Sequence, residues 1–407
     1  MKAAICFLFL DYLPLAVRTY RHILLAMGLT AAINGLLYPI MALYVYHISQ
    51  DYFLVGMMMA LPFLAAVPMS FIWGLVSDRI GSRRKVMAVA GTIGGALFFV
   101  MPFAGTTGLI VLRLIQVAFT TSFVLMNAVA TECYPSRKGR SVGDLNLVGG
   151  IGQAGGALAA GILLPSTQMF VGSDASIMMF SISGIITILA ALSLLPMVEK
   201  QAKISKSGLN GMLSFGQGRS LLPITAVALI LPLAGYLVFS VFPIYLGTLA
   251  IPWDATMIAG AFTALSAVTG IFAAGIAGRA CDAHGRKWVL VGAGAAYVLV
   301  WGGMGLTSDP LMTAILWAVP VWSFFYVSVT TMVSDLTKDH ERGRGIGLVN
   351  SAVNLGAAMG SLAAGYLLAE GTVNTTFFLA AGISLAGMAV ALMTRETLKS
   401  RKQPMID

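Results

Sequence analysis

Residues 74–85 read Gly-Leu-Val-Ser-Asp-Arg-Ile-Gly-Ser-Arg-Arg-Lys, and they separate two apolar runs, Phe53 to Val76 and Val86 to Phe103. Each run is about as long as the ~20 residues that a membrane-spanning helix needs. Only a tight turn fits between the runs, and Gly74 and Gly81 suit close backbone contact and a sharp bend. The three cations that end the stretch would lie among lipid headgroups. The stretch therefore predicts a helical hairpin that crosses a membrane twice.

The same stretch resembles the signature loop G-x-x-x-D-R-x-G-R-R between the second and third helices of the major facilitator superfamily. The matching positions are Gly74, Asp78, Arg79, Gly81, Arg83 and Arg84. A basic membrane anchor would explain the cations, but it would not explain the glycines and the aspartate at these spacings. The resemblance implies an all-α membrane protein, with twelve transmembrane helices in two pseudo-symmetric six-helix bundles.

The composition agrees with a chain that lies mostly in lipid. Of the 407 residues, 58% are hydrophobic and 10% are charged, whereas a soluble domain carries roughly 25% charged residues. The three cysteines, Cys6, Cys133 and Cys281, lack the spacing of metal ligands, so we expect free thiols and no disulfide. The sequence contains no nucleotide-binding loop, metal cluster or catalytic constellation, so we expect neither an enzyme nor a cofactor.

Twelve apolar stretches follow an ambiguous N-terminal segment, Met1 to Arg21. Their expected ranges are 22–47, 53–77, 86–105, 107–132, 142–165, 176–197, 221–248, 255–279, 288–307, 310–335, 345–369 and 374–394. The long polar gap lies at the centre of the chain and is rich in lysine and glycine, which is typical of a linker. We therefore expect a bundle over residues 1–198, a cytoplasmic linker over 199–219 and a second bundle over 220–407.

The cations fix the expected orientation. Every Lys and Arg except Arg113 lies in the N-terminal segment, an even-numbered turn, the central linker or the C-terminal tail. Positive charge concentrates on the cytoplasmic side of membrane proteins. We therefore expect a multi-pass protein of the plasma (inner) membrane with both termini in the cytoplasm. The net charge of +9 then lines a membrane surface, which argues against nucleic acid as a partner.

The two halves of the chain repeat at an offset of 204 residues. The matched pairs include Pro39 with Pro243, Gly56 with Gly260, Gly74 with Gly278, Asp78 with Asp282, Gly81 with Gly285, Gly139-Arg140 with Gly343-Arg344, and Asn146 with Asn350. Chance does not readily place charged turns at one offset. Because each half has six spans, both halves begin on the same side, and the repeat is parallel with its axis along the membrane normal.

Arg113 is the one cation inside an expected span, where a charge costs ~2.5–3.5 kcal/mol at the helix centre. On a continuous helix, one arc of about 60° would hold Arg113, Gln116, Thr120, Asn127 and Thr131. The resemblance adds a fourth-helix motif of the family, R-x-x-Q-G, which reads Arg113-Leu-Ile-Gln116-Val117 here and lacks the final glycine. We expect this stripe to bind solute or couple transport, and the alternative is an arginine that snorkels to the outer headgroups.

The equivalent tenth span replaces the charge with aromatic residues. Trp317 and Phe324 correspond to Arg113 and Thr120, and one helical face would hold Trp317, Phe324, Ser328, Thr331 and Asp335. Aromatic and cationic walls would then oppose each other across a cavity that suits an amphipathic or anionic solute; ordinary packing is the alternative. The resemblance adds weaker cavity candidates from the first and seventh spans: Asn34, Tyr38, Tyr236 and Phe239.

The acidic residues lie at expected helix ends and not in mid-membrane. Glu132 and Asp335 match the acidic position that the family places at the end of its fourth and tenth helices. The resemblance therefore implies a gate network of salt bridges. The gate residues that it implies are Gly74, Asp78, Arg79, Gly81, Arg83, Arg84, Glu132, Asp282 and Asp335. Proton carriage by Glu132 is the less favoured alternative.

The sequence leaves the driving force and the solute open. The fifth span, Gly156-Ala157-Leu-Ala-Ala160-Gly161, is rich in small residues but lacks the glycine-proline motif of the family's antiporters, which favours close helix packing as its role. We expect a monomeric secondary transporter that moves a small organic solute by alternating access, with proton-linked efflux as the first hypothesis. Facilitated uptake or symport is the alternative, and a non-transporting receptor or scaffold is the alternative from another class.

Overall fold

The computed structural model describes residues 15–133, 138–164, 170–197, 218–249, 254–337 and 342–398. These residues form helices and no strands, and twelve helical segments among them are long and apolar enough to cross a membrane. The segments are Thr19–Ser49, Tyr52–Ile80, Arg83–Phe103, Thr106–Ala130, Gly143–Leu163, Asp174–Ser193, Leu221–Thr248, Ala255–His284, Arg286–Leu306, Pro310–Leu336, Arg344–Glu370 and Val373–Met393. The predicted all-α membrane fold is confirmed, and each segment coincides with an expected span.

The opening stretch forms the predicted hairpin. Helix α3 (Tyr52–Ile80) ends at Gly81, whose φ of 70° is left-handed and favours glycine. Helix α4 (Arg83–Leu97) begins directly afterwards, and the Ser82 side chain caps it by accepting from the backbone N–H of Lys85 at 3.3 Å. The expected close contact at Gly74 is wrong, because a Cβ added there would meet no atom within 4 Å.

The chain divides into two compact units. Unit 1 comprises Met1–Lys206 and Phe242–Val268, and unit 2 comprises Ser207–Val241 and Thr269–Asp407. Most of the expected linker, 199–219, lies outside the described residues. The division into bundles over 1–198 and 220–407 stays a prediction.

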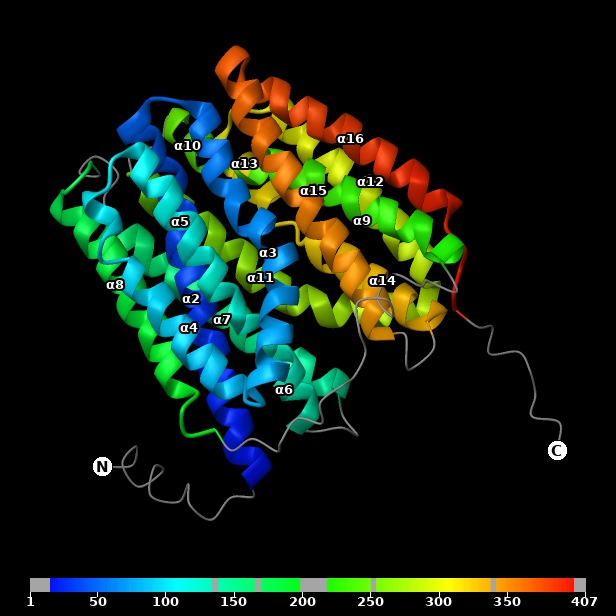
Figure 1. Cartoon of the computed structure of the whole chain (residues 1–407). Helices are drawn as coiled ribbons and strands as arrows, with labels where there is room; N and C mark the ends of the chain where they lie inside the picture. The colour runs from blue at the N-terminus through cyan, green and yellow to red at the C-terminus, as the bar shows by residue number, and fades with distance from the viewer. Residues whose placement is uncertain are drawn as a thin grey trace, which may run out of the picture. The chain divides into compact units, whose positions relative to one another are not determined.

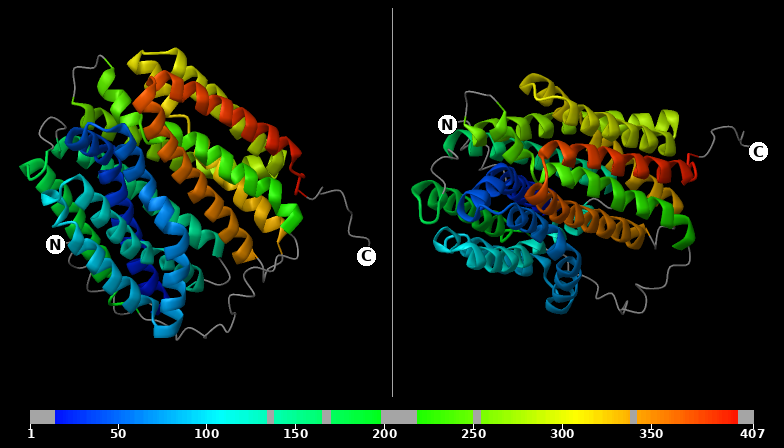
Figure 2. Two further views of the ribbon diagram at one scale, coloured as in Figure 1. Left: turned by 45° about the horizontal axis from the view of Figure 1, so that its top comes forward. Right: turned by 90° about the horizontal axis from the view of Figure 1, so that it is seen from above.

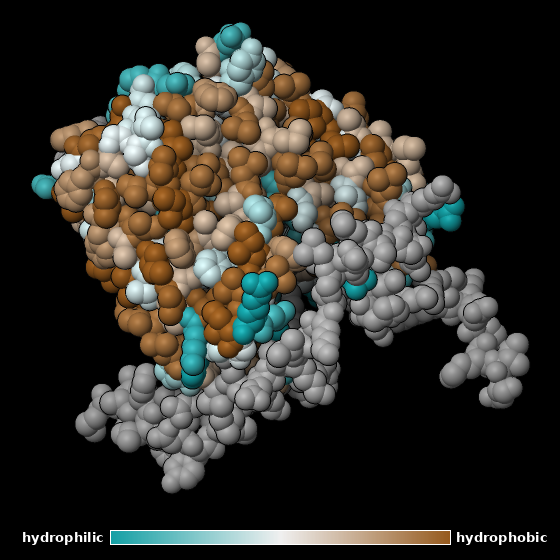
Figure 3. Space-filling model, in the orientation of Figure 1, coloured by the Kyte–Doolittle hydropathy of each residue, from teal (hydrophilic) through white to brown (hydrophobic). Residues whose placement is uncertain are grey.

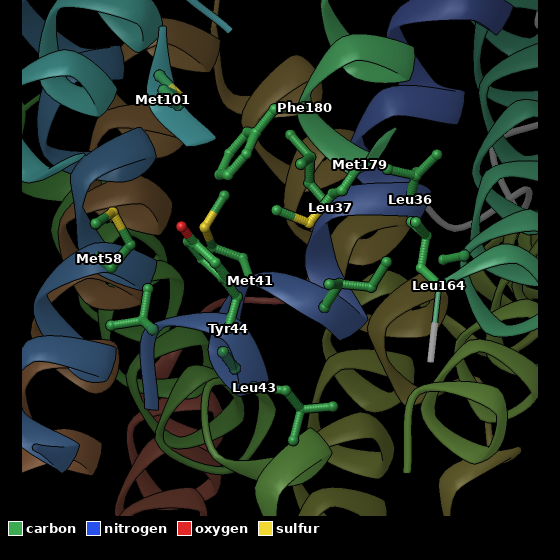
Figure 4. Close-up of a cluster of buried hydrophobic side chains, with 14 of the residues drawn as sticks. Leu36, Leu37, Met41, Leu43, Tyr44, Met58, Met101, Leu164, Met179 and Phe180 are labelled. Carbon is green, nitrogen blue, oxygen red and sulfur yellow. The ribbon is translucent and has the colours of Figure 1, made fainter. Parts of the chain in front are cut away.

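In unit 1, α2 (Leu15–Ser49) packs along α7 (Lys138–Leu163), and α4 packs along α8 (Asp174–Ser193) (Figure 1). Glycines bring α2 and α7 into backbone contact, because a Cβ added at Gly152 or Gly156 would meet the backbone oxygen of Gly28 or Ala32. The expected role of the glycine-rich fifth span in close packing is confirmed by this contact. Unit 1 also contains a cluster of buried apolar side chains. In Figure 4, Met41, Met58, Met101 and Met179 surround Tyr44 and Phe180, whose rings meet edge to face at 5.4 Å.

In unit 2, α9 (Gly218–Phe239) packs against α15 (Arg342–Glu370) and α16 (Val373–Met393) (Figures 1 and 2). Helix α12 (Arg286–Leu306) packs against α16 and α14 (Val321–Leu336). The α9–α15 contact repeats the glycine packing of unit 1, because a Cβ added at Gly356 or Gly360 would meet the backbone oxygen of Leu229 or Leu233. Across both units, the elements not yet given bounds are η2 (Met101–Phe103), α5 (Thr106–Thr120), η3 (Thr121–Val124), α6 (Leu125–Cys133), α10 (Phe242–Thr248), α11 (Ala255–His284) and α13 (Pro310–Trp317).

The surface agrees with burial in lipid. Figure 3 shows hydrophobic residues over most of the visible face and hydrophilic residues gathered mainly towards its ends. The exposed hydrophobic side chains of the described residues include those of Ile162, Phe272, Leu299 and Leu306, which are 72–81% exposed. Apolar side chains that face outward on membrane-length helices are favourable in hydrocarbon and costly in water.

Candidate functional site

Helix α5 brings three of the predicted solute residues together. The guanidinium Nη1 of Arg113 donates to Gln116 Oε1 at 2.6 Å, and Gln116 Nε2 donates to Thr120 Oγ1 at 3.2 Å. The Thr120 hydroxyl lies 3.1 Å from the Gln116 carbonyl oxygen and donates to it. Residues three and four positions apart are neighbours on a helix, so this spacing builds a relay of oriented hydrogen bonds.

The charge of Arg113 has no counter-ion in this relay. Its Nε is buried and has no hydrogen-bond acceptor among the described residues. None of the ion pairs among those residues includes Arg113. A buried charge without a partner costs several kcal/mol, and a guanidinium can hold a carboxylate through two parallel N–H donors. The relay therefore leaves donor capacity that an anionic group can use.

The predicted stripe does not continue along one helix, because the fourth span is broken. Helix α5 ends at Thr120, the 3₁₀ turn η3 follows, and α6 begins at Leu125. Hydroxyl groups compete with the helical ladder here: Thr121 Oγ1 donates to the Val117 carbonyl oxygen at 2.7 Å. The single 60° arc is therefore wrong. Asn127 is exposed on α6, the side chain of Thr131 lies outside the described residues, and a solute role for Asn127 stays a prediction.

The tenth span is broken as well. Helix α13 ends at Trp317 and α14 begins at Val321, because Pro320 has no backbone N–H to continue the ladder. The predicted single face that joins Trp317 to Phe324 and Asp335 is therefore wrong, although Pro320 in the sequence signals the break. Trp317 instead stacks on Phe239 of α9 at 5.8 Å, and Phe239 contacts Tyr236 at 5.3 Å.

The other predicted solute residues differ in their burial and in the hydrogen bonds that their side chains make. Ser328 is buried, and its hydroxyl donates to the Phe324 carbonyl oxygen at 2.7 Å and lies 3.5 Å from Cys281 Sγ. Phe324 and Tyr38 are half-buried. Asn34 is exposed in α2, within the span Thr19–Ser49. An exposed carboxamide inside a span is costly in lipid and is favoured beside a polar cavity.

Two of the predicted gate residues of unit 1 meet, at the start of α4 and the end of α6. Arg83 Nη1 lies 2.5 Å from Glu132 Oε1 in a charge-assisted hydrogen bond. Arg84 Nη1 donates to the carbonyl oxygens of Leu195 and Met197 at 3.1 and 2.8 Å, so this cation ties the start of α4 to the chain that leaves α8. Asp78 is half-buried and Arg79 is exposed.

Unit 2 has a corresponding network with different chemistry. Arg286, at the start of α12, lies 3.2 Å from Asp282 and 3.2 Å from Asp335. The Glu396 carboxylate accepts from the backbone N–H groups of Arg286 and Lys287 at 3.0 and 3.2 Å. Thr397 donates to Asp335 Oδ2 at 2.9 Å. The chain that leaves α16 is thus tied to the start of α12.

Sequence reasoning included Asp282 and Asp335 but missed Arg286 and Glu396. Partial burial raises the pKa of Glu396, but backbone donors from Leu398, Arg286, Thr397 and Lys287 outweigh it, and the pKa lies below its usual value. The sequence does hold a usable signal, because Glu396 comes just beyond the last apolar span. In the structure its carboxylate lies against Gly285 at the start of α12, where a Cβ would meet it, and the φ of Gly285 is 96°.

Within the described residues, no group of three or more His, Cys, Asp or Glu side chains could hold a metal ion. Cys133 and Cys281 are free thiols there, while Cys6 lies outside the described ranges. Burial, and secondarily the Glu132 carboxylate, raises the pKa of Cys133, so its thiolate is disfavoured.

The described fold is that of a multi-pass membrane protein with a relay of polar side chains inside one of its spans. A family model of the Major Facilitator Superfamily matches residues 23–279 and 253–407. The chain belongs to this superfamily. Membership places it among the membrane transporters of small solutes and not among enzymes.

Solved structures of similar fold include three transporters at low sequence identity. The nucleoside transporter NupG is 13% identical with a TM-score of 0.75, over 94% of this chain and 99% of that one. A bacterial homologue of the human lysosomal transporter Spinster is 14% identical with a TM-score of 0.74, over 94% and 97%. A D-xylose–proton symporter is 14% identical with a TM-score of 0.73, over 93% and 97%. A comparison with curated proteins found no match.

Proposed function

We propose that the chain is a secondary active transporter that moves a small amphipathic or anionic organic solute by alternating access. The observation that carries the proposal is the guanidinium of Arg113, whose buried Nε has no acceptor and whose charge has no ion-pair partner among the described residues. A solute carboxylate or phosphate would supply both. Gln116 and Thr120 position the guanidinium through their hydrogen bonds.

The proposed driving force is exchange of the solute for protons, so that the protein acts in efflux. The resemblance of Arg113-Leu-Ile-Gln116 to the fourth-helix motif of the family supports this direction. Uptake, by facilitation or symport, is the second candidate, because one of the similar structures is a D-xylose–proton symporter. The nucleoside transporter among the similar structures supports a small organic solute in either case.

Flux into proteoliposomes tests the class of solute and the coupling together. Purified protein is reconstituted, and uptake is measured for a panel of organic anions and neutral analogues with and without a pH gradient. Proton-linked exchange predicts that acid inside the vesicles accelerates uptake, whereas proton symport predicts that acid outside does so. Anion flux that ignores both gradients would contradict proton coupling, and flux of neutral solutes alone would contradict the proposed role of Arg113.

The proposed setting is the plasma (inner) membrane, with both termini cytoplasmic and the protein monomeric. The distribution of Lys and Arg supports this orientation. The two ends of α16 provide a test, because Thr372 and Arg395 are both exposed. In a background without the native cysteines, an impermeant thiol reagent added to intact cells should label Thr372→Cys and spare Arg395→Cys. Labelling in the opposite pattern would reverse the proposed topology.

A further inference from the structure

A continuous run of aromatic rings links four helices of unit 2. We call it the aromatic ladder; its members in order are Tyr297, Trp301, Trp317, Phe239, Tyr236, Trp322 and Tyr326. Consecutive ring centroids lie 5.3–6.4 Å apart, within the range that favours stacked and edge-to-face pairs. The rings come from α12, α13, α9 and α14, so the ladder fixes these helices against one another.

The two ends of the ladder differ in exposure. At one end, Tyr297, Trp301 and Trp317 are buried, with 4–7% of their surface exposed. Towards the other end, Trp322 is 39% exposed and the last ring, Tyr326, is half-buried. Buried rings hold the exposed ring in a fixed orientation, so little conformational entropy would be lost when a ligand stacks on it. The ladder therefore ends in a prepared aromatic surface.

The ring of Trp322 lies on the side of α14 that packs against its neighbours. It meets Tyr236 of α9 edge-on at 6.3 Å and stacks on Tyr326 at 6.0 Å. Tyr326 in turn donates its hydroxyl to Asn350 Oδ1 of α15 at 3.3 Å. The exposed ring thus borders α9, its stacking partner Tyr326 reaches α15, and it does not project from the far side of α14.

A free hydrogen-bond donor lies beside the open end of the ladder. The Asn350 side chain accepts from Tyr326 through Oδ1, and its Nδ2 donates to no described residue. We propose that Trp322 and Asn350 form a subsite for a planar aromatic ring that carries a hydrogen-bond acceptor at its edge. This inference rests on the proposed transport function and names the class of solute.

An exposed tryptophan can instead anchor a helix at the lipid headgroups, and Trp288 fits that role. It is 59% exposed at the start of α12, and Lys287 Nζ lies 5.6 Å from its ring. Trp322 differs because it lies near the middle of the 27-residue span Pro310–Leu336. Its exposure is therefore not explained by headgroup contact, and Trp288 provides a matched control.

Calorimetric binding to the purified full chain in nanodiscs tests the proposal with two anions of similar size, 2-naphthoate and decahydro-2-naphthoate. Wild type should bind the aromatic anion ~2–10-fold more tightly than the saturated one. Trp322→Leu should remove that preference, Trp322→Phe should keep part of it, and Trp288→Leu should leave it unchanged. Asn350→Leu should remove a preference for quinoline-6-carboxylate over 2-naphthoate.

An unchanged aromatic preference in Trp322→Leu would overturn the inference, as would a wild type that binds neither anion. The proposed function has a separate outcome in the same assay. If Arg113→Gln weakens both anions equally while Trp322→Leu changes neither, then the role of Arg113 stands and the aromatic subsite is wrong. If Trp322→Leu removes the preference while Arg113→Gln binds both anions as wild type does, the subsite stands and the role of Arg113 is wrong.

Discussion

Arg113 in unit 1 and Trp317 in unit 2 occupy equivalent positions, 204 residues apart in the internal repeat, but their surroundings differ. Trp317 is 5% exposed and stacks on Phe239, so packing accounts for it. Arg113 is held by Gln116, but its Nε is buried without an acceptor among the described residues. The comparison teaches that symmetry predicts which positions correspond, whereas what distinguishes Arg113 from its equivalent is a charge that has no ion-pair partner among the described residues.

The largest expected effect on stability comes from a substitution that removes the packing around Trp317. Trp317→Ala should lower the free energy of unfolding by ~3–5 kcal/mol, because it takes a buried indole from its contacts with Phe239 and Trp301. Arg113→Gln should not lower it, since loss of an embedded charge reduces the insertion cost. Denaturation in detergent, followed by circular dichroism, measures both. Equal losses in the two variants would contradict the difference between the positions.

The next largest effect concerns the close helix contact at glycine that both units share. A Cβ at Gly156 would meet the Ala32 backbone oxygen, and one at its repeat partner Gly360 would meet the Leu233 oxygen. Gly156→Val and Gly360→Val should each cost ~1–3 kcal/mol, the usual penalty of overpacking. Gly155→Val is the control, because nothing lies within 4 Å of its added Cβ. If all three variants unfold at the same temperature, backbone contact does not hold the helix pairs.

The sequence predicted the fold because membrane-spanning helices can be identified from the length and hydropathy of apolar runs. The turn at Gly81 was predicted as well, since its left-handed backbone favours glycine. The candidate site was predicted only as far as α5 runs regularly, which covers Arg113, Gln116 and Thr120. Beyond Thr120, periodicity failed because hydroxyl groups and Pro320 interrupt the helical ladder, and a fixed 100° rotation cannot represent a broken helix.

Partners that meet only in three dimensions were outside the reach of the sequence. Glu396 contacts the start of α12 across 110 residues, and the ladder joins Tyr297 to Tyr326 through two further helices. Single residues at helix ends or on apolar faces carry no periodic signal that would pair them. Composition could therefore suggest an aromatic wall, but it could not predict which ring stays open.

The smallest expected effect compares how the two units tie their last span to their third. Arg84 binds carbonyl oxygens in unit 1, whereas the Glu396 carboxylate binds N–H groups in unit 2. Because the pKa of folded Glu396 is lowered, its stabilisation is complete above the unfolded value of ~4.3 and is lost as pH falls through the folded value. A carboxylate at a helix N-terminus contributes ~0.3–1 kcal/mol.

Unfolding of Glu396→Gln and Arg84→Gln between about pH 7 and about pH 3 checks this difference. The gap between wild type and Glu396→Gln should narrow as the solution becomes acidic, because the wild-type carboxylate takes up a proton as the pH falls through its lowered pKa. The gap for Arg84→Gln should stay constant, since the guanidinium remains charged throughout. A Glu396→Gln gap that persists at the acidic end would assign the contact to packing and not to charge.

The central claim is that the charge of Arg113 serves transport, and flux in variants at this position tests it most directly. Anion uptake is measured in proteoliposomes at matched protein density for wild type, Arg113→Gln, Arg113→Lys and, as a control, Arg395→Gln, which changes an exposed arginine outside the spans. We predict that Arg113→Gln reduces uptake at least ~10-fold, that Arg113→Lys restores it in part because the planar fork is lost, and that Arg395→Gln transports as wild type does. Wild-type rates in both Arg113 variants would contradict the claim and return Arg113 to a snorkelling role.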